Sequence, residues 1–344
     1  MNRTFRTFWR SSPGSGRRSR RLPTLLLTGL AVSALVGPAA LTGSAAASVP
    51  PPADGWSTMF SDDFEGAAGS RLDGADWLYD IGTGYPGGAP NWGTGEIEVS
   101  TDSTDNVYQD GEGHMVIKPI KDSAGNWTSG RVETQRTDFG APEGGQMEMS
   151  ASIKQPNPEK ALGYWPAFWA MGADARPVGA TNWPSIGELD IMEDVNGLSK
   201  HSTTFHCGEW AGECHDPDGI SSDLQACDGC QTDFHTYSVI VDRTNAAAEQ
   251  LRFYLDGKET YRVDQNQVSE ATWRTAVDHG FFAIFDVAIG GSYPNKVCGC
   301  TSPAADTSSG AGMSVDWFAV YKTDNGATAG PAPAVAHGSA HERP

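Results

Sequence analysis

Three acidic residues, Glu188, Asp190 and Glu193, occur in one short segment whose pattern predicts a β-strand. Branched and apolar residues alternate with the acids, a proline precedes the segment, and an Asn-Gly pair typical of a turn follows it. Because alternate side chains of a strand point to opposite faces, Glu188 and Asp190 share one face. Strict alternation would turn Glu193 into the core, where an unpaired carboxylate costs too much free energy.

A β-bulge at Ile191-Met192 would remove this conflict. The extra residue of a bulge returns Glu193 to the face that carries the other two acids. Such a row of carboxylates suits a solvated strand face, a calcium site, or a pair of carboxylates that hydrolyses a glycosidic bond with a third acid between them. The spacing alone leaves all three interpretations open.

The first 47 residues have the pattern of a signal peptide. Seven arginines and no acid precede an apolar run at residues 25–36 that is too short to span a bilayer comfortably. Ala45-Ala46-Ala47 fits a small-residue cleavage site, and residues 19–22 also resemble a twin-arginine signal, so the export route stays open. We expect a secreted, extracellular protein that has no membrane association after signal cleavage.

The chain is strongly acidic, with a formal net charge of −19, and removal of the arginine-rich first 47 residues would make it more so. This charge argues against nucleic acid and anionic membranes as partners, because both require basic surfaces. A neutral polysaccharide remains a suitable partner. The 11 tryptophans agree with sugar binding, since large aromatic side chains contribute strongly wherever they make contact.

The length suits one large β-domain or two ordinary domains, and we expect one. We expect a Pro/Ala-rich linker at residues 48–55, a β-domain at 56–322, and a disordered Gly/Ala/Pro tail at 323–344. Many short strands, with a single short helix at residues 269–278, predict an all-β sandwich. We expect the protein to be a monomer.

Individual strands carry more specific expectations. Gln146–Lys154 alternates so regularly that it predicts a strand buried on one face only. Residues 313–321 alternate in the same way and predict a single apolar face, and residues 91–100 are expected to contain another strand. Trp165 and Trp169 lie four positions apart, so that in a regular strand they share one face and could form a platform for a sugar.

The six cysteines suggest either zinc ligands or disulfides, and we favour disulfides because these persist outside the cell. The sequence does not decide their connectivity. The pairs are expected to staple two loop regions that flank the acidic cleft. These cysteines are Cys207, Cys214, Cys227, Cys230, Cys298 and Cys300.

Read with its surroundings, the acidic segment resembles family 16 of the glycoside hydrolases. The match is Glu188-Leu189-Asp190-Ile191-Met192-Glu193, the longer, bulged form of the family signature, which accompanies laminarinase-like endo-β-1,3-glucanases. Flanking segments in the family's order extend the resemblance over roughly residues 56–321. These segments are residues 60–66, 91–93, 129–131, 164–169, 234–237, 254–257 and 315–317.

The resemblance implies a concanavalin-like β-jelly roll with a concave substrate cleft and a retaining endo-glycosidase that needs no cofactor for catalysis. Glu188 would be the nucleophile, Asp190 its orienting neighbour and Glu193 the acid/base. The resemblance also implies a set of substrate-binding residues. These are Trp165, Trp169, His206, Trp92 and Arg131.

Relatives often hold a structural calcium ion near the first and last strands, where Glu65 and Asp316 match. The cysteine-rich residues 207–230 and 298–300, and Asp286 where relatives often have Asn, depart from the plain laminarinase pattern. The glycan therefore stays open among β-1,3-glucan, which we expect, mixed-linkage glucan, β-1,3-galactan and agarose. A transglycosylase, a lectin-like sandwich without catalysis and a calcium-stabilised matrix protein are the alternative functions.

Overall fold

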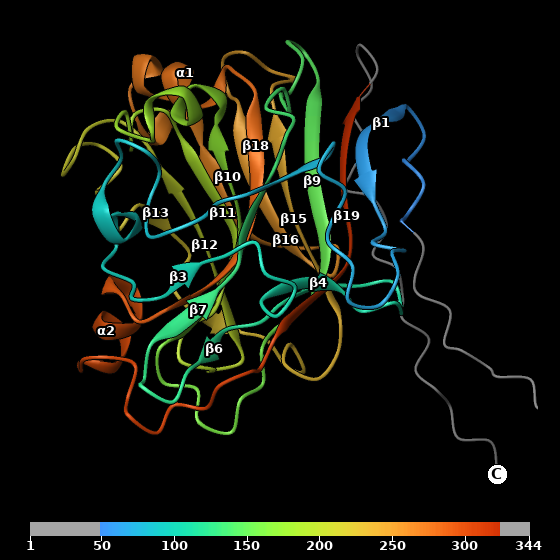
Figure 1. The fold of residues 1–344 in the computed structure, drawn as a ribbon. Helices are drawn as coiled ribbons and strands as arrows, with labels where there is room; N and C mark the ends of the chain where they lie inside the picture. The colour runs from blue at the N-terminus through green and yellow to red at the C-terminus, as the bar shows by residue number, and fades with distance from the viewer. Residues whose placement is uncertain (1–48, 324–344) are drawn as a thin grey trace, which may run out of the picture. The chain divides into compact units, whose positions relative to one another are not determined.

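The computed structural model describes residues 49–323 (Figure 1). The predicted signal peptide and almost all of the predicted tail lie outside these residues. Thr323, which the sequence placed in the tail, instead ends the last strand. Among the described residues, no helix has both the length and the apolar character needed to cross a bilayer.

Two large antiparallel sheets build the described domain as a sandwich (Figure 1), which confirms the predicted all-β jelly roll. The first sheet has eight strands. Their spatial order is β17 (Lys258–Asp264), β16 (Gln250–Leu255), β15 (His235–Asp242), β9 (Gln146–Lys154), β19 (Met313–Thr323), β5 (Met115–Ile117) and β4 (Val107–Gln109), with β1 (Trp56–Asp62) also paired with β19.

The second eight-stranded sheet carries the acidic segment. Its spatial order is β13 (Ile220–Ser221), β12 (Lys200–His206), β11 (Glu188–Glu193), β10 (Tyr164–Gly172), β18 (Phe281–Ile289), β8 (Arg131–Thr134) and β2 (Trp77–Tyr79), with β14 (Gln225–Ala226) also paired with β12. A small third sheet is formed by β3 (Val99–Ser100), β7 (Trp127–Ser129) and β6 (Ile120–Lys121).

Two short α-helices accompany the sheets (Figure 1). α1 (Glu270–Val277) confirms the expected helix, and Ser269 caps it by accepting a hydrogen bond from the Thr272 amide. α2 (Ser292–Cys298) was not predicted. The 3₁₀ helices are η1 (Pro90–Gly93), η2 (Ala173–Val178) and η3 (Gln265–Gln267).

The expected strand at residues 91–100 is wrong for most of its length, because only Val99–Ser100 is extended in a sheet. Asn91 and Trp92 instead adopt left-handed backbone angles, with φ of 51° and 53°. The amide of Trp92 donates to the carbonyl of Thr83 at 3.0 Å, which ties this turn to the preceding Gly-rich loop. The turn lets Trp92 line the cleft described below.

The core lies between the two large sheets and is rich in aromatic side chains. Phe168 of β10 stacks on Phe285 of β18, with ring centroids 4.6 Å apart and planes 5° from parallel. Phe318 of β19 meets both rings edge-on from the opposite sheet, at 5.8 and 5.4 Å. This cluster fixes the back face of β10 and β18, whose front face lines the cleft.

β9 differs from its prediction because both of its faces are buried. Met147 and Met149 point into the main core as expected, yet Glu148 and Ser150 on the other face are each only 1% exposed. β9 lies between β15 and β19 in the middle of its sheet, and side chains also cover the outer face. Alternation therefore identified the strand correctly, although it did not show that the polar face is covered.

β19 does not keep one apolar face, because a β-bulge interrupts its pairing with β9 between Val315 and Trp317. Beyond the bulge, Phe318 faces the main core, while Trp317 and Tyr321 form a separate outer cluster. The Tyr321 hydroxyl donates to the carbonyl of Pro50 at 2.6 Å.

Residues 49–55, expected as a linker, contribute to covering this outer cluster. Val49 and Ala53 pack against Trp56, Trp317 and Tyr321. The apolar surface that the bulge turns outward is thus removed from water by the segment that leads into β1.

Candidate active site

The bulge predicted within the acidic strand is present. Opposite β10, Phe168 pairs with Met192 and Trp169 pairs with Asp190, so that Ile191 is the extra residue of β11. Pairing with β12 shifts across the same stretch. Leu189, Ile191 and Met192 all belong to the main core. The bulge therefore returns Glu193 to the face of Glu188 and Asp190, as expected.

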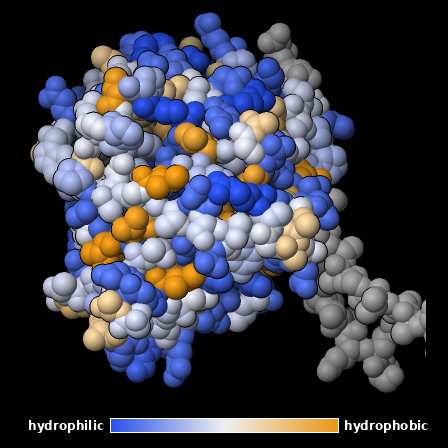
Figure 2. All heavy atoms as spheres, in the orientation of Figure 1, coloured by the Kyte–Doolittle hydropathy of each residue, from blue (hydrophilic) through white to orange (hydrophobic). Residues whose placement is uncertain are grey.

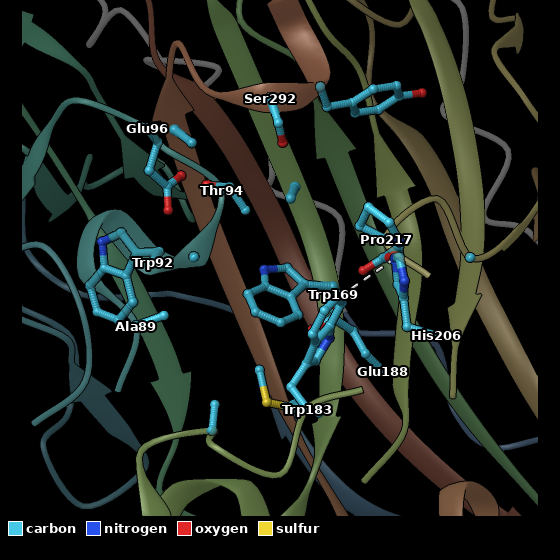
Figure 3. A pocket seen from close by; sticks show the side chains of 18 of the residues that line it. Ala89, Trp92, Thr94, Glu96, Trp169, Trp183, Glu188, His206, Pro217 and Ser292 are labelled. Atoms are coloured by element: carbon cyan, nitrogen blue, oxygen red, sulfur yellow. Dashed lines mark ion pairs between the residues drawn. The ribbon is translucent and has the colours of Figure 1, made fainter. Parts of the chain in front are cut away.

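A cavity of about 1080 Å³ lies over this face of the sheet. Figure 3 shows Trp169 between Trp92 on one side and Glu188 with His206 on the other. All eight residues predicted for catalysis and substrate binding line this cavity. They are Glu188, Asp190, Glu193, Trp165, Trp169, His206, Trp92 and Arg131.

Glu188, Asp190 and His206 form a tight group, in which one oxygen or nitrogen of each lies within 4.8 Å of the others. His206 Nε2 lies 3.1 Å from Asp190 Oδ2 and 3.8 Å from Glu188 Oε1. The other ring nitrogen, Nδ1, contacts Asp216 Oδ1, whose side chain is fully buried. Burial lowers the pKa of His206, but hydrogen bonds to Asp190 and Asp216 outweigh it, so the pKa lies well above its usual value.

Glu193 lies at the other end of the acidic row. The indole Nε1 of Trp165 donates to Glu193 Oε1 at 2.8 Å. The Trp165 ring also meets Tyr293 of α2 edge-on, with centroids 5.7 Å apart. Burial, and next the charge of Asp190, raise the pKa of Glu193 well above its usual range, so its protonated form is favoured.

The pKa of Glu188 is also raised, to about 8, first by burial and then by the charge of Asp190. Three groups act in the opposite direction: the charges of His206 and Arg131, and a hydrogen bond from Trp183. Burial and the charge of Asp190 therefore raise the pKa of both glutamates, and at each one His206 and a tryptophan N–H act against the rise. The charge of Arg131 adds to this opposition at Glu188, which suits the acid that must ionise more readily.

Arg131 lines the cavity but is only 5% exposed, because other protein groups surround its guanidinium. It is held by Asp80 at 3.1 Å and by Asp286 at 3.3 Å. Its Cζ lies 4.2 Å from the ring centre of Trp92 and 4.6 Å from that of Trp169. Arg131 therefore mainly holds two aromatic rings of the cleft wall in place. Its contacts with acids and rings leave few N–H groups to donate to a sugar.

The predicted calcium ligands lie away from the cavity. Glu65 is exposed, whereas Asp316 is 2% exposed and accepts a hydrogen bond from Ser152 at 3.2 Å next to the bulge of β19. Within residues 49–323, neither acid belongs to a group of three His, Cys, Asp or Glu side chains close enough to share an ion. The calcium site stays a prediction.

The six cysteines form three disulfides, as expected, and each closes a local loop. The pairs are Cys207–Cys214, Cys227–Cys230 and Cys298–Cys300. Cys227 and Cys230 also lie close to His235, but their sulfurs are bonded to each other and so are not available as zinc ligands. The first loop contributes Trp210 to the wall of the cavity, and Lys296 of α2, just before the third loop, also lines it.

Sequence reasoning missed several residues of the cleft. Trp183 precedes the acidic strand, and its ring centre lies 5.4 Å from that of His206 and 5.8 Å from that of Trp210. Tyr85 and Glu96 come from the Gly-rich stretch and the segment after it, where no periodicity points to a role. Proximity to the acidic motif was the only signal that favoured Trp183.

Figure 2 shows one face of the molecule as mostly hydrophilic, with hydrophobic residues in several separate small groups. Large exposed hydrophobic side chains are few among the described residues, and Trp210, at 64%, is the most exposed aromatic of them. Because Trp210 lines the cavity beside Trp183, its exposed ring belongs to the cleft.

Comparison with known proteins agrees with this site. A family model described as "XgeA-like, catalytic GH16 domain" matches residues 155–238. The crystal structure of an endo-1,3-beta-glucanase from Streptomyces sioyaensis is 48% identical, with a TM-score of 0.77, and the match covers 80% of this chain and 99% of that one. The laminarinase catalytic domain from Thermotoga maritima is 28% identical, with a TM-score of 0.62 and coverage of 78% and 99%.

Among relatives found by sequence, glucan endo-1,3-beta-glucosidase A1 of Niallia circulans is 29% identical over 293 residues. The match covers 78% of this chain but 38% of that protein, so this chain spans well under half the length of that relative. The fold and the acidic cleft place the chain among the β-jelly-roll glycoside hydrolases. It belongs to glycoside hydrolase family 16.

Proposed function

We propose that this chain is a secreted, retaining endo-glycosidase that hydrolyses internal β-1,3 linkages of β-1,3-glucan. The observation that carries the proposal is the placement of Glu188, Asp190 and Glu193 side by side on one bulged strand beneath the cavity. The printed names of the similar proteins, an endo-1,3-beta-glucanase and a laminarinase, support the choice of glucan.

In the first step, the ionised Glu188 attacks the anomeric carbon while Glu193 gives its proton to the glycosidic oxygen that leaves. A covalent glycosyl ester on Glu188 results. In the second step, Glu193, now ionised, removes a proton from water, and the resulting hydroxide displaces Glu188 from the anomeric carbon. Two displacements at one carbon restore its original β configuration.

The lining of the cleft suits a neutral chain of sugars. Five tryptophans line it: Trp92, Trp165, Trp169, Trp183 and Trp210. Such rings contribute apolar contact area and tolerate uncharged sugars. The basic side chains of the lining are Arg131, Lys296 and His206, and each is paired with an acid, so the cleft has little to attract a sulfated polymer.

Secretion is part of the proposal and rests on the sequence pattern of residues 1–47 and on the three disulfides, which are typical of oxidising compartments. N-terminal sequencing of the exported protein tests it. A mature chain that starts near Ser48 is expected, whereas one that starts at Met1 would contradict cleavage.

The substrate is tested by incubating the protein in parallel with laminarin, curdlan, lichenan, β-1,3-galactan and agarose, and by measuring reducing ends and product sizes. We expect mid-chain cleavage of laminarin and curdlan. Activity confined to galactan or agarose would overturn the glucan assignment but keep the mechanism. Tight binding without any new reducing ends would favour the lectin-like alternative.

Two variants separate the roles of the acids. Glu188→Ala should nearly abolish turnover, because no nucleophile remains. Glu193→Ala should lower kcat by about 10²–10⁴-fold on glucan, and by less on an aryl glycoside whose leaving group needs no proton. Equal losses for Glu193→Ala on both substrates would contradict its role as the acid.

A further inference from the structure

We propose that Asp216 is a positioning residue of the active site, which holds His206 with both ring nitrogens protonated so that its cation lies against the Glu188–Asp190 pair. The inference rests on the proposed function, since the cation of His206 favours the ionised form of the proposed nucleophile, Glu188. Asp216 itself does not line the cavity, and its side chain is fully buried.

The contacts on the two ring nitrogens of His206 carry the argument. Nε2 faces Asp190 Oδ2 at 3.1 Å, and Nδ1 faces Asp216 Oδ1. A neutral imidazole has only one N–H, so one of these two contacts would then set a nitrogen lone pair against a carboxylate. Only the doubly protonated ring donates to both acids at once.

Asp216 is held firmly for this contact. Its Oδ2 accepts the backbone amide of Cys207 at 3.3 Å, and its carbonyl accepts the amide of Ala211 at 2.9 Å. The disulfide between Cys207 and Cys214 closes the turn between His206 and Asp216. The acid therefore reaches back to the end of β12 from a loop with few alternative positions.

Close packing fixes the ring as well. Gly219, at φ of +68°, passes so near that an added Cβ would lie 2.9 Å from His206 Cε1 and 2.3 Å from Thr204 Cγ2. The Trp183 ring lies on another side of the imidazole, with centroids 5.4 Å apart. His206 thus has little room to turn away from Asp190 or Asp216.

The charges that face His206 come from two elements. Glu188, Asp190 and Glu193 belong to β11, and Asp216 follows the disulfide-closed loop, two residues after Cys214. Without the anion of Asp216, His206 would lose its proton at a lower pH. A neutral His206 no longer stabilises ionised Glu188, so the pKa of Glu188 would rise and the acid limb of activity would move to higher pH.

Asp216→Asn tests this, because it removes the charge and nearly preserves the shape. We expect the acid limb of kcat/KM to move upward by about one pH unit or more, with kcat roughly tenfold lower at neutral pH. KM should change little, since Asp216 is buried behind His206 and does not line the cavity.

Glu213→Gln is the matched control. Glu213 lies three residues before Asp216, inside the loop that the Cys207–Cys214 disulfide closes, and its carboxylate accepts a hydrogen bond from the amide of Ser269. Glu213 should help to anchor the loop, so Glu213→Gln should leave the acid limb of kcat/KM unchanged. If both variants shift the acid limb equally, or if Asp216→Asn leaves it unchanged while the wild type cleaves glucan, the positioning role is overturned.

A measurement on the unmodified protein covers the case in which Asp216→Asn does not fold. Nitrogen-15 NMR of the imidazole groups, with His206 assigned by its loss in His206→Gln, should show both nitrogens protonated at neutral pH. One unprotonated nitrogen would overturn the proposal. This readout needs no substrate, so it remains decisive even if none of the glycans is cleaved and the proposed function fails.

Discussion

The indole N–H of Trp165 donates a hydrogen bond of 2.8 Å to Glu193, the proposed acid/base residue. This bond favours the ionised carboxylate and so opposes the effect of burial on the pKa of Glu193. It also holds the carboxyl at one end of the acidic row. Trp165 therefore both lines the cleft and influences the pKa of the proposed acid/base residue.

Trp165→Phe keeps an aromatic ring and removes the donor. The pKa of Glu193 should then rise, so the alkaline limb of kcat/KM should move to higher pH. We expect kcat at the optimum to fall severalfold, since one net hydrogen bond is worth about 1 kcal/mol. Trp169→Phe is the control, because Trp169 bonds Asp286 instead. An alkaline limb that shifts equally in both variants would contradict this role.

The acid limb of the wild-type pH profile should report the ionisation of Glu188, the proposed nucleophile. Because the nucleophile works only when ionised, activity falls as the pH drops through its pKa, which burial and Asp190 raise to about 8. The limb in kcat/KM should therefore lie well above the value of about 4.3 of an ordinary glutamate. Measurement of kcat/KM on laminarin across both limbs checks this, and an acid limb near the ordinary value would contradict it.

The buried cluster around Arg131 should matter for stability. Arg131→Met leaves Asp80 and Asp286 without their cation, so we expect the free energy of unfolding to fall by about 3–5 kcal/mol. Urea denaturation at neutral pH measures it. Arg71→Met is the control, because the pair of Arg71 with Asp102 is about half exposed. A loss of about 1 kcal/mol or less for Arg131→Met would mean that its ion pairs contribute no more than an exposed surface pair, which would contradict the prediction.

The three disulfides predict that the denatured, unreduced protein contains no free thiols. Refolding and storage in a reducing buffer should lower the melting temperature, because opened loops gain freedom in the unfolded chain. Free thiols are counted after denaturation, with and without reductant, to test this prediction. Six thiols without reductant would contradict the pairing.

The acidic strand was readable from the sequence because a misplaced Glu193 has a large energetic cost, and only a bulge removes it. The bulge at Asp316 of β19 had no such signal, since Trp317 and Tyr321 are acceptable on either face when other groups cover them. Periodicity therefore predicted the position of that strand, but not which of its side chains face the main core.

The residues of the candidate site also divide into those that a local sequence pattern predicted and those that it did not. Residues of the acidic motif and the aromatic strand β10 were found from their own spacing. The contact between His206 and Asp216 was not, because a loop of irregular structure brings the acid back to the end of β12. Arg131 was identified as a cleft residue, yet its partners Asp80 and Asp286 come from segments about 50 and 155 positions away.

The configuration of the first-formed product tests the central claim most directly. Proton NMR during early hydrolysis of laminarin records the anomeric signal of each new reducing end before mutarotation. Glu188 as nucleophile and Glu193 as acid/base require two displacements, so the β-anomer must be released first. First release of the α-anomer would mean inversion by a single displacement, and the role of Glu188 would be wrong.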